Sequence, residues 1–142
     1  MIIVKDRVTQ LQLGVHYRDV SYKYQLLRDY VHSDCSIYGY TFKSPFIEMT
    51  NRGELKVSAG YAWDGLSGGI DTRTSMRGSL VHDALYQCLR MKMLPQECRA
   101  FADREFLRVC IEDGMRKLRA QWMYYVVRCC GWQAAAPKKG ES

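Results

Sequence analysis

The 142-residue sequence has no long hydrophobic run and no cysteine pair of the CxxC kind. No window approaches the roughly 18 apolar residues that a membrane-spanning helix requires. The opening residues, MIIVKDRVTQ, lack the apolar stretch of a secretory signal peptide. Internal repeats and abrupt changes in composition are also missing. We therefore expect one domain over residues 1–133 with no transmembrane segment and no secretion by a signal peptide, followed by a flexible tail over 134–142.

The missing CxxC spacing argues against a zinc ribbon, although the chain has six cysteines. Cys88, Cys98, Cys110 and Cys129 fall at apolar positions of helical patterns, where cysteine acts as a small hydrophobic residue. With no secretory signal, a disulfide framework is not expected. The pattern predicts reduced thiols in a cytosolic protein, with the adjacent Cys129 and Cys130 packed in the core.

Acidic residues are outnumbered, which leaves a net charge of +6 and a pI near 9.1. This balance suits an anionic partner such as nucleic acid, a phospholipid surface or an acidic protein, and it equally suits a soluble basic protein with no such partner. No motif of interleaved basic and aromatic residues stands out, so nucleic acid is the least favoured partner.

The first half of the chain reads as strands. Residues 23–32, KYQLLRDYVH, are rich in Tyr, Val and Leu and partly alternate, which predicts one strand. In residues 46–63, two alternating runs flank the turn NRGE, where Gly53 can adopt a positive φ. This second pattern predicts a β-hairpin.

Three helices are predicted in the second half, over 75–91, 95–114 and 115–130. Thr74 or Ser75 can cap the first, Pro95 opens the second and Gly114 ends it. The predicted class is therefore α+β: a small N-terminal antiparallel sheet or hairpin followed by a three-helix bundle, two of whose helices run antiparallel and carry a polar site.

The first predicted helix has two faces. Its apolar face comprises Leu80, Val81, Ala84, Leu85, Cys88 and Leu89. Its polar stripe comprises Ser79, His82, Asp83, Tyr86 and Arg90. His82 and Tyr86 are four residues apart and so share one face. Taken alone, this helix fits a solvated polar stripe with an ordinary histidine.

The second predicted helix changes that balance. Arg104, Glu105, Arg108 and Glu112 form what we expect to be its exposed face. Asp103 lies instead on the arc of its apolar residues, and a buried carboxylate needs a partner. The short connection KMLPQE would bring Asp103 towards His82. Such a pair either orients a general base or only holds two helices in register.

The loop GYAWDGLSGG supplies a third element. Gly65 and Gly68 would let backbone carbonyls approach an ion closely. Asp64 in this loop and Asp83 beside His82 offer hard oxygen ligands, which suit Ca²⁺ better than zinc.

Four segments, GELKVSAGYAWDGLSGG, SLVHDALY, FADREF and MYYVVRCCGW, occur in an order that resembles the domain-of-unknown-function 1353 family of bacteriophage and prophage proteins. The resemblance covers most of the chain. It implies a phage or bacterial origin, location in the host cytoplasm or incorporation in the virion, and other phage structural proteins as partners. It implies no particular activity.

The glycine loop, the H-D-x-x-Y helix and the later aspartate more distantly resemble the active-site helices of phospholipase A₂. That resemblance implies His82 as the base that activates water, Asp103 as the residue that orients it and Tyr86 as a supporting tyrosine. It gives Asp83 the role of calcium carboxylate. Two functions follow: a Ca²⁺-dependent lipid or ester hydrolase acting at an anionic phospholipid surface, or a non-enzymatic virion or tail component in which the same cluster is structural.

Overall fold

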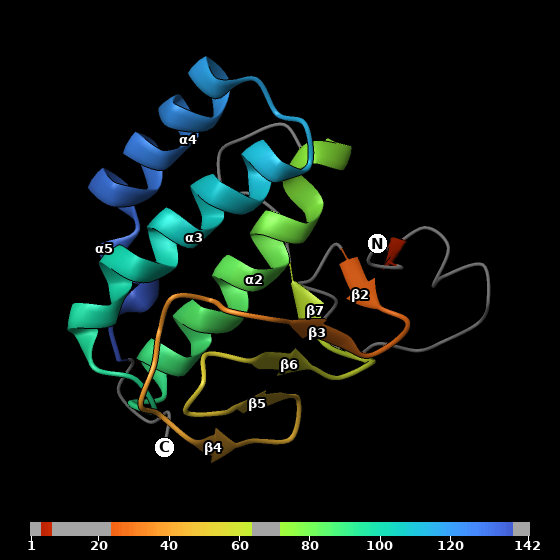
Figure 1. Cartoon of the computed structure of the whole chain (residues 1–142), viewed down its shortest axis with the longest axis vertical. Helices are drawn as coiled ribbons and strands as arrows, with labels where there is room; N and C mark the ends of the chain where they lie inside the picture. The colour runs from red at the N-terminus through yellow and green to blue at the C-terminus, as the bar shows by residue number, and fades with distance from the viewer. Residues whose placement is uncertain (1–3, 7–23, 64–71, 138–142) are drawn as a thin grey trace.

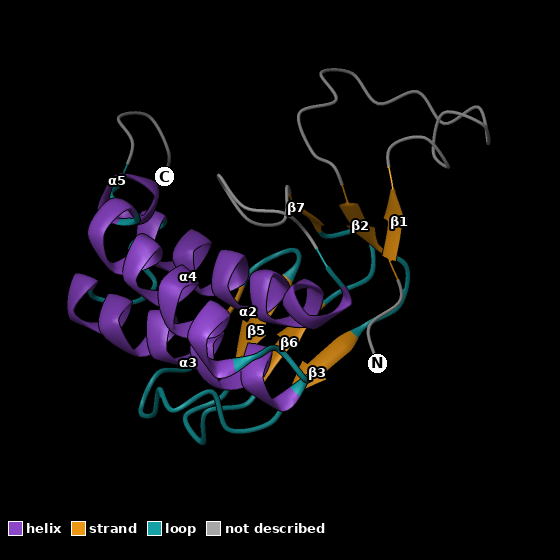
Figure 2. Cartoon of the chain, turned by 90° about the horizontal axis from the view of Figure 1, so that it is seen from above, coloured by secondary structure: helices purple, strands orange, loops and turns teal. Residues whose placement is uncertain are grey.

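The α+β class is confirmed by the structure, a computed structural model that describes residues 4–6, 24–63 and 72–137. Short antiparallel strands come first and helices follow (Figure 1). Seen from above, the long helices lie side by side and the strands lie to one side of them (Figure 2).

The strands form two antiparallel sheets. One has the order β1-β2-β7, with bounds β1 (Val4–Asp6), β2 (Tyr24–Leu26) and β7 (Ala62–Trp63). The other has the order β3-β6-β5-β4, with bounds β3 (Tyr30–His32), β4 (Phe42–Lys43), β5 (Ile47–Met49) and β6 (Leu55–Val57).

The predicted hairpin is present as β5 and β6, in which Ile47 pairs with Val57 and Met49 with Leu55. Its turn contains Gly53 at φ 80°. A Cβ at Gly53 would also lie 2.9 Å from the ring of Tyr38, so the turn needs glycine for both conformation and space.

The single strand predicted over 23–32 is wrong, because the segment divides into β2 and β3 in different sheets. The chain bends between them at Leu27 and Arg28. The next residue, Asp29, accepts at Oδ1 a hydrogen bond of 2.8 Å from the backbone N–H of Ala59. Leu26 is buried at the end of β2 and exchanges backbone hydrogen bonds with Gly60 and Tyr61. These long-range bonds are invisible to a pattern based on alternation.

Three long helices agree with the predicted ranges to within a few residues: α2 (Arg73–Arg90), α3 (Arg99–Glu112) and α4 (Lys117–Cys130). The N-cap of α2 is Thr72 rather than Thr74 or Ser75, and its backbone N–H donates to Ser75 Oγ at 2.9 Å. Pro95 precedes a short 3-10 turn, η1 (Gln96–Cys98), that leads into α3. Gly114, at φ 98°, lies in the turn that separates α3 from α4.

A fourth helix, α5 (Trp132–Ala135), crosses the predicted boundary at residue 133. Ala135 is completely buried, and its carbonyl oxygen accepts a 2.8 Å hydrogen bond from Gln96 Nε2. Packed structure therefore continues to Ala135, which corrects the start of the predicted tail. Residues 138–142 lie outside the described residues.

The six cysteines are free, and Cys88 and Cys110 are buried as predicted. Burial raises the pKa of each of these two thiols to about 12, so they stay protonated at neutral pH. The predicted core position of Cys129 and Cys130 is wrong, since both are exposed at the end of α4. The apolar pattern of α4 has two sides, and only one of them packs against the protein.

In the part of the chain that the structure describes, no helix has both the length and the apolar character to cross a lipid bilayer.

Candidate functional site

His82 on α2 and Asp103 on α3 form the predicted pair. His82 Nε2 lies 2.7 Å from Asp103 Oδ1. Asp103 is fully buried, whereas the His82 side chain keeps 13% of its surface exposed. An ionised carboxylate can only accept a hydrogen bond, so Nε2 of a neutral His82 carries the hydrogen and Nδ1 keeps its lone pair. No residue in the described ranges hydrogen-bonds to Nδ1.

Tyr86 completes the predicted trio. Its hydroxyl donates to the same Oδ1 of Asp103 at 2.6 Å. One helical turn separates Tyr86 from His82, and the two ring centroids are 4.0 Å apart. The ring of Phe106 lies 5.4 Å from His82 on another side. The imidazole is therefore held by one hydrogen bond and two aromatic neighbours.

Two arginines that the sequence did not single out also reach Asp103. Arg128 on α4 donates from Nη1 to Oδ2 at 2.8 Å. Arg99 Nε lies 3.9 Å from the same oxygen and donates to the hydroxyl of Tyr86 at 3.2 Å. Through these contacts, Asp103 joins α2, α3 and α4.

These donors decide the ionisation of Asp103. Burial raises the pKa of this carboxyl, but hydrogen bonds from His82, Tyr86 and Arg128 outweigh burial, and the pKa lies below its ordinary value. Asp103 is thus a carboxylate at neutral pH. Its hydrogen bond with Nε2 fixes the orientation and the tautomer of the His82 ring.

Asp83 points to a different neighbour. The hydroxyl of Tyr61 donates to Asp83 Oδ2 at 2.6 Å, and burial raises the pKa of Tyr61 well above its usual range. Nearby, Trp63 Nε1 donates to Ser79 Oγ at 3.0 Å. Asp83 therefore belongs to the contact between α2 and the chain around β7, on a different side of α2 from Asp103.

The other predicted metal ligands, Asp64, Gly65 and Gly68, lie outside the described residues. Among the residues that are described, no three His, Cys, Asp or Glu side chains gather as a metal-binding group. The described residues contribute one carboxylate, Asp83, to the predicted calcium site. Asp83 is next to His82 in the sequence, and its hydrogen-bond partner is Tyr61.

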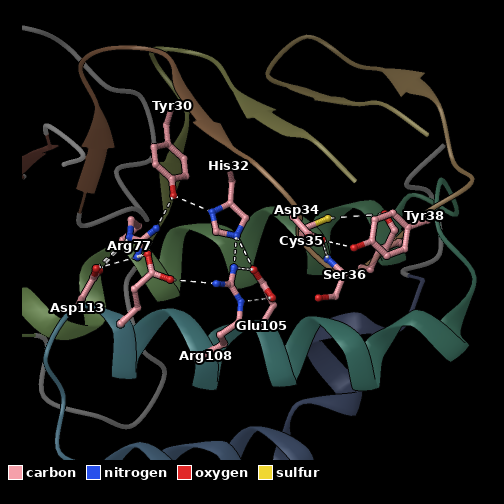
Figure 3. Close-up of polar contacts among 12 residues, drawn as sticks. Tyr30, His32, Asp34, Cys35, Ser36, Tyr38, Arg77, Glu105, Arg108 and Asp113 are labelled. Atoms are coloured by element: carbon pink, nitrogen blue, oxygen red, sulfur yellow. Dashed lines mark hydrogen bonds and ion pairs between the residues drawn. The ribbon is translucent and has the colours of Figure 1, made fainter. Parts of the chain in front are cut away.

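The predicted exposed face of α3 is wrong at Glu105, which is only 2% exposed. Its Oε1 lies 2.5 Å from Nε2 of His32 on β3. Figure 3 shows this pair enclosed by Arg108, which donates to Glu105, and by Tyr30, whose hydroxyl is 2.8 Å from His32 Nδ1. Burial raises the pKa of Glu105. The hydrogen bonds from His32 and Arg108 outweigh this effect and hold the pKa below its ordinary value.

This second histidine–carboxylate pair fastens β3 to α3. Both nitrogens of His32 have protein partners and its side chain is 3% exposed, so it has no lone pair directed at solvent. His82 differs in both respects, which makes His82 the better candidate for chemistry. Helical periodicity could not reveal the Glu105 pair, because its partner comes from a strand 73 residues away.

The sequence did contain signals for the two missed arginines. Arg99 precedes Asp103 by one helical turn, the spacing of an intrahelical ion pair. Arg128 is a lone charge in the apolar run MYYVVRCC. A charge in such a place needs a partner, as does a buried carboxylate.

Gly131, between α4 and α5, lets Tyr86 approach the chain. A Cβ there would lie 2.4 Å from the carbonyl oxygen of Val127 and 2.5 Å from the Tyr86 hydroxyl. We expect Gly131→Ala to lower the free energy of unfolding by roughly 1–3 kcal/mol, because backbone must shift. Thermal unfolding measures this effect, with Gln133→Ala on exposed α5 surface as the control. An unchanged melting temperature in Gly131→Ala would contradict the close approach.

Comparison with known proteins adds no relative: no protein-family model matches the sequence, and no curated protein or solved structure matches it. The resemblances to the domain-of-unknown-function 1353 family and to phospholipase A₂ therefore stay predictions from the sequence.

Proposed function

We propose that the chain is a hydrolase of lipid or other carboxylic esters, in which His82 acts as general base. One observation carries the proposal: His82 is held through Nε2 by a buried carboxylate while its Nδ1 accepts no hydrogen bond within the described residues. A base of this kind takes a proton from a water molecule as that water attacks the ester carbonyl.

Each supporting residue has a limited task. Asp103 accepts the Nε2 hydrogen of His82 and stabilises the imidazolium that forms when Nδ1 takes the proton. Tyr86 and Arg128 hold the carboxylate of Asp103 in place by their hydrogen bonds of 2.6 and 2.8 Å. Phe106 borders the imidazole and limits its rotation. The proton then passes from Nδ1 to the leaving alkoxide, which restores the neutral base.

We further propose Ca²⁺ as the cofactor, with Asp83 as a ligand and Asp64, Gly65 and Gly68 as the expected loop contribution. When bound, calcium would polarise the ester carbonyl and stabilise the negative oxygen that develops on it. A hard carboxylate oxygen suits this ion, and Asp83 follows His82 directly in the sequence. The hydrogen bond from Tyr61 orients Asp83, as an outer hydrogen bond often orients a metal ligand.

The calcium requirement gives the test of this proposal. Purified protein is assayed for fatty-acid release from phospholipid and for hydrolysis of a soluble ester, with added calcium or with chelator. We expect activity that needs calcium, and a calcium requirement raised at least about tenfold in Asp83→Asn, because a neutral amide replaces a charged ligand. Glu54→Gln, which removes an exposed carboxylate from the β5–β6 turn, is the matched control. Activity that is equal with and without chelator would rule out the calcium role.

The contacts of Arg99 and Arg128 support a second candidate function. Their contacts with Asp103 and Tyr86 make the cluster a link among three helices. Such a link suits a non-enzymatic component of a phage particle, as the first resemblance implies. This alternative predicts no ester hydrolysis by the pure protein and incorporation of the chain into purified particles.

A further inference from the structure

The outward side of α4 carries a continuous row of large apolar side chains. Leu118, Trp122 and Tyr125 are 84%, 69% and 62% exposed, and they are spaced by four and three residues, as one helix face requires. Cys129 continues the row one turn later, and Trp132, 57% exposed, follows at the start of α5. We call Leu118, Trp122, Tyr125 and Trp132 the outer stripe.

The outer stripe lies on the side of α4 that faces away from α3. Figure 1 shows α3 between α2 and α4, and α4 packs on α3 through Ala120, Met123 and Val127. In a helix with 3.6 residues per turn, those positions lie opposite to Leu118, Trp122 and Tyr125. Two aromatic residues and a leucine on one open face exceed the scattered exposed apolar residues of an ordinary surface.

The chain segment that carries the outer stripe has charges of one sign only. Residues 115–137 contain four basic residues and no acidic residue. Arg128 donates a hydrogen bond to Asp103, and Arg119 donates to Thr72 Oγ1 at 3.3 Å. Arg116 and Lys117 are exposed at the beginning of α4, and neither forms an ion pair with a described residue. The partially positive N-terminus of α4 adds to their charge.

We propose that the outer stripe is a docking surface for an anionic phospholipid bilayer, with α4 lying in the plane of the interface. Tryptophan and tyrosine favour the boundary between headgroups and acyl chains, leucine enters the apolar side, and the basic end attracts acidic headgroups. The charges select this occupant over a second copy of the chain, because two outer stripes would face each other with positive charges and no acidic partner.

The arrangement also favours lipid over nucleic acid. A surface that binds single-stranded nucleic acid carries basic residues along the whole row of aromatic rings, because they contact the phosphates. Here the exposed cations lie at one end, and the middle of the row is flanked by the uncharged residues Gln121 and Val126. The inference goes beyond the proposed hydrolysis, since binding needs only α4 and α5 and no residue of the His82 site.

The test is sedimentation of the protein with vesicles of phosphatidylcholine, alone or containing phosphatidylglycerol. We expect binding only to the anionic vesicles, weakened by added salt. The triple variant Leu118→Ser, Trp122→Ser and Tyr125→Ser should lose at least about tenfold in partitioning, because its interfacial side chains are gone. Leu27→Ser with Val31→Ser, at two half-exposed apolar residues outside α4, is the matched control and should bind normally.

Charge is tested separately from the apolar residues. Arg116→Gln with Lys117→Gln should weaken binding roughly fivefold for each charge. Lys43→Gln with Arg52→Gln removes the same charge from the sheet side and should have a much smaller effect. Circular dichroism and melting temperature establish that each variant is folded.

Fluorescence provides a reading that needs no disruptive variant. Trp63 is fully buried, whereas Trp122 and Trp132 are exposed. Anionic vesicles should shift the emission to shorter wavelength, and Trp122→Phe should remove much of that shift. Equal vesicle binding by the folded triple variant would overturn the proposal. The proposal is also overturned if the wild-type protein binds no vesicles and instead forms concentration-dependent dimers, or binds DNA or RNA, through the residues that the triple variant lacks. Ester hydrolysis is scored separately on a soluble substrate, so either proposal can fail alone.

Discussion

His82→Gln is expected to lower kcat for ester hydrolysis by roughly 10²–10⁴-fold, the usual contribution of a positioned general base. Glutamine places an amide N–H near the position of His82 Nε2, so it can still donate to Asp103 Oδ1, where the native distance is 2.7 Å. It has no lone pair at the place of Nδ1. The substitution therefore removes the base while keeping the hydrogen bond that a structural role would need.

The matched measurement is stability. With the hydrogen bond to Asp103 kept, the melting temperature of His82→Gln should change little. His32→Gln is the companion variant, because it alters the buried His32–Glu105 pair and leaves the His82 site intact. It should lower stability and leave kcat close to that of the wild type. If His82→Gln retains full activity, His82 is not the base, and the structural function of the cluster is the better explanation.

Asp103→Ala is expected to lower the free energy of unfolding by about 3–5 kcal/mol, as removal of one partner from a buried ion pair usually does. Asp103 is fully buried and receives hydrogen bonds from His82, Tyr86 and Arg128. Without the carboxylate, these donors lose their acceptor inside the protein, and Arg128 loses its counter-charge. Chemical denaturation of the wild type and the variant measures the difference.

Glu97→Ala is the control for this prediction, because it removes an exposed carboxylate from η1 and should change stability by less than about 0.5 kcal/mol. An effect of Asp103→Ala as small as that of the control would mean that the cluster does not join the three helices.

The contribution of Asp103 to stability also depends on pH. Its pKa in the folded protein is lower than its ordinary value, so the unfolded chain takes up the proton first as the solution is acidified. The full contribution is present above the ordinary carboxyl pKa of about 4. It declines as the pH falls through the lower folded value. The difference in unfolding free energy between wild type and Asp103→Ala should therefore be constant near neutrality and shrink below about pH 4.

Several features of the site were predictable because they follow from local spacing. A spacing of four positions from His82 to Tyr86 places both side chains on one face of any helix. An aspartate on the apolar arc of the next helix must find a partner, and the short connection between the helices left His82 as the nearest one. The structure confirms that contact, with the hydroxyl of Tyr86 on the same oxygen.

Other features depended on contacts between distant parts of the chain. Glu105 has the spacing of an exposed residue, yet it is buried because His32 arrives from β3. Segment 23–32 has one alternating pattern, yet it bends at Leu27 and Arg28 into two strands that pair in different sheets, and Asp29 binds the backbone of Ala59. Periodicity describes the neighbours of a residue along one element, and it gives no information about a partner from another element.

By itself, the sequence determined the α+β order of elements, the three long helices and the His82–Asp103 pairing, because hydrophobic periodicity, turn residues and the cost of a lone buried carboxylate act locally. Only the tertiary structure decided the rest. It brought Arg99 and Arg128 onto Asp103, exposed Cys129 and Cys130, and left the outer stripe uncovered. The helix α4 is apolar on two sides, and only its packing on α3 selects which side becomes core and which faces outward.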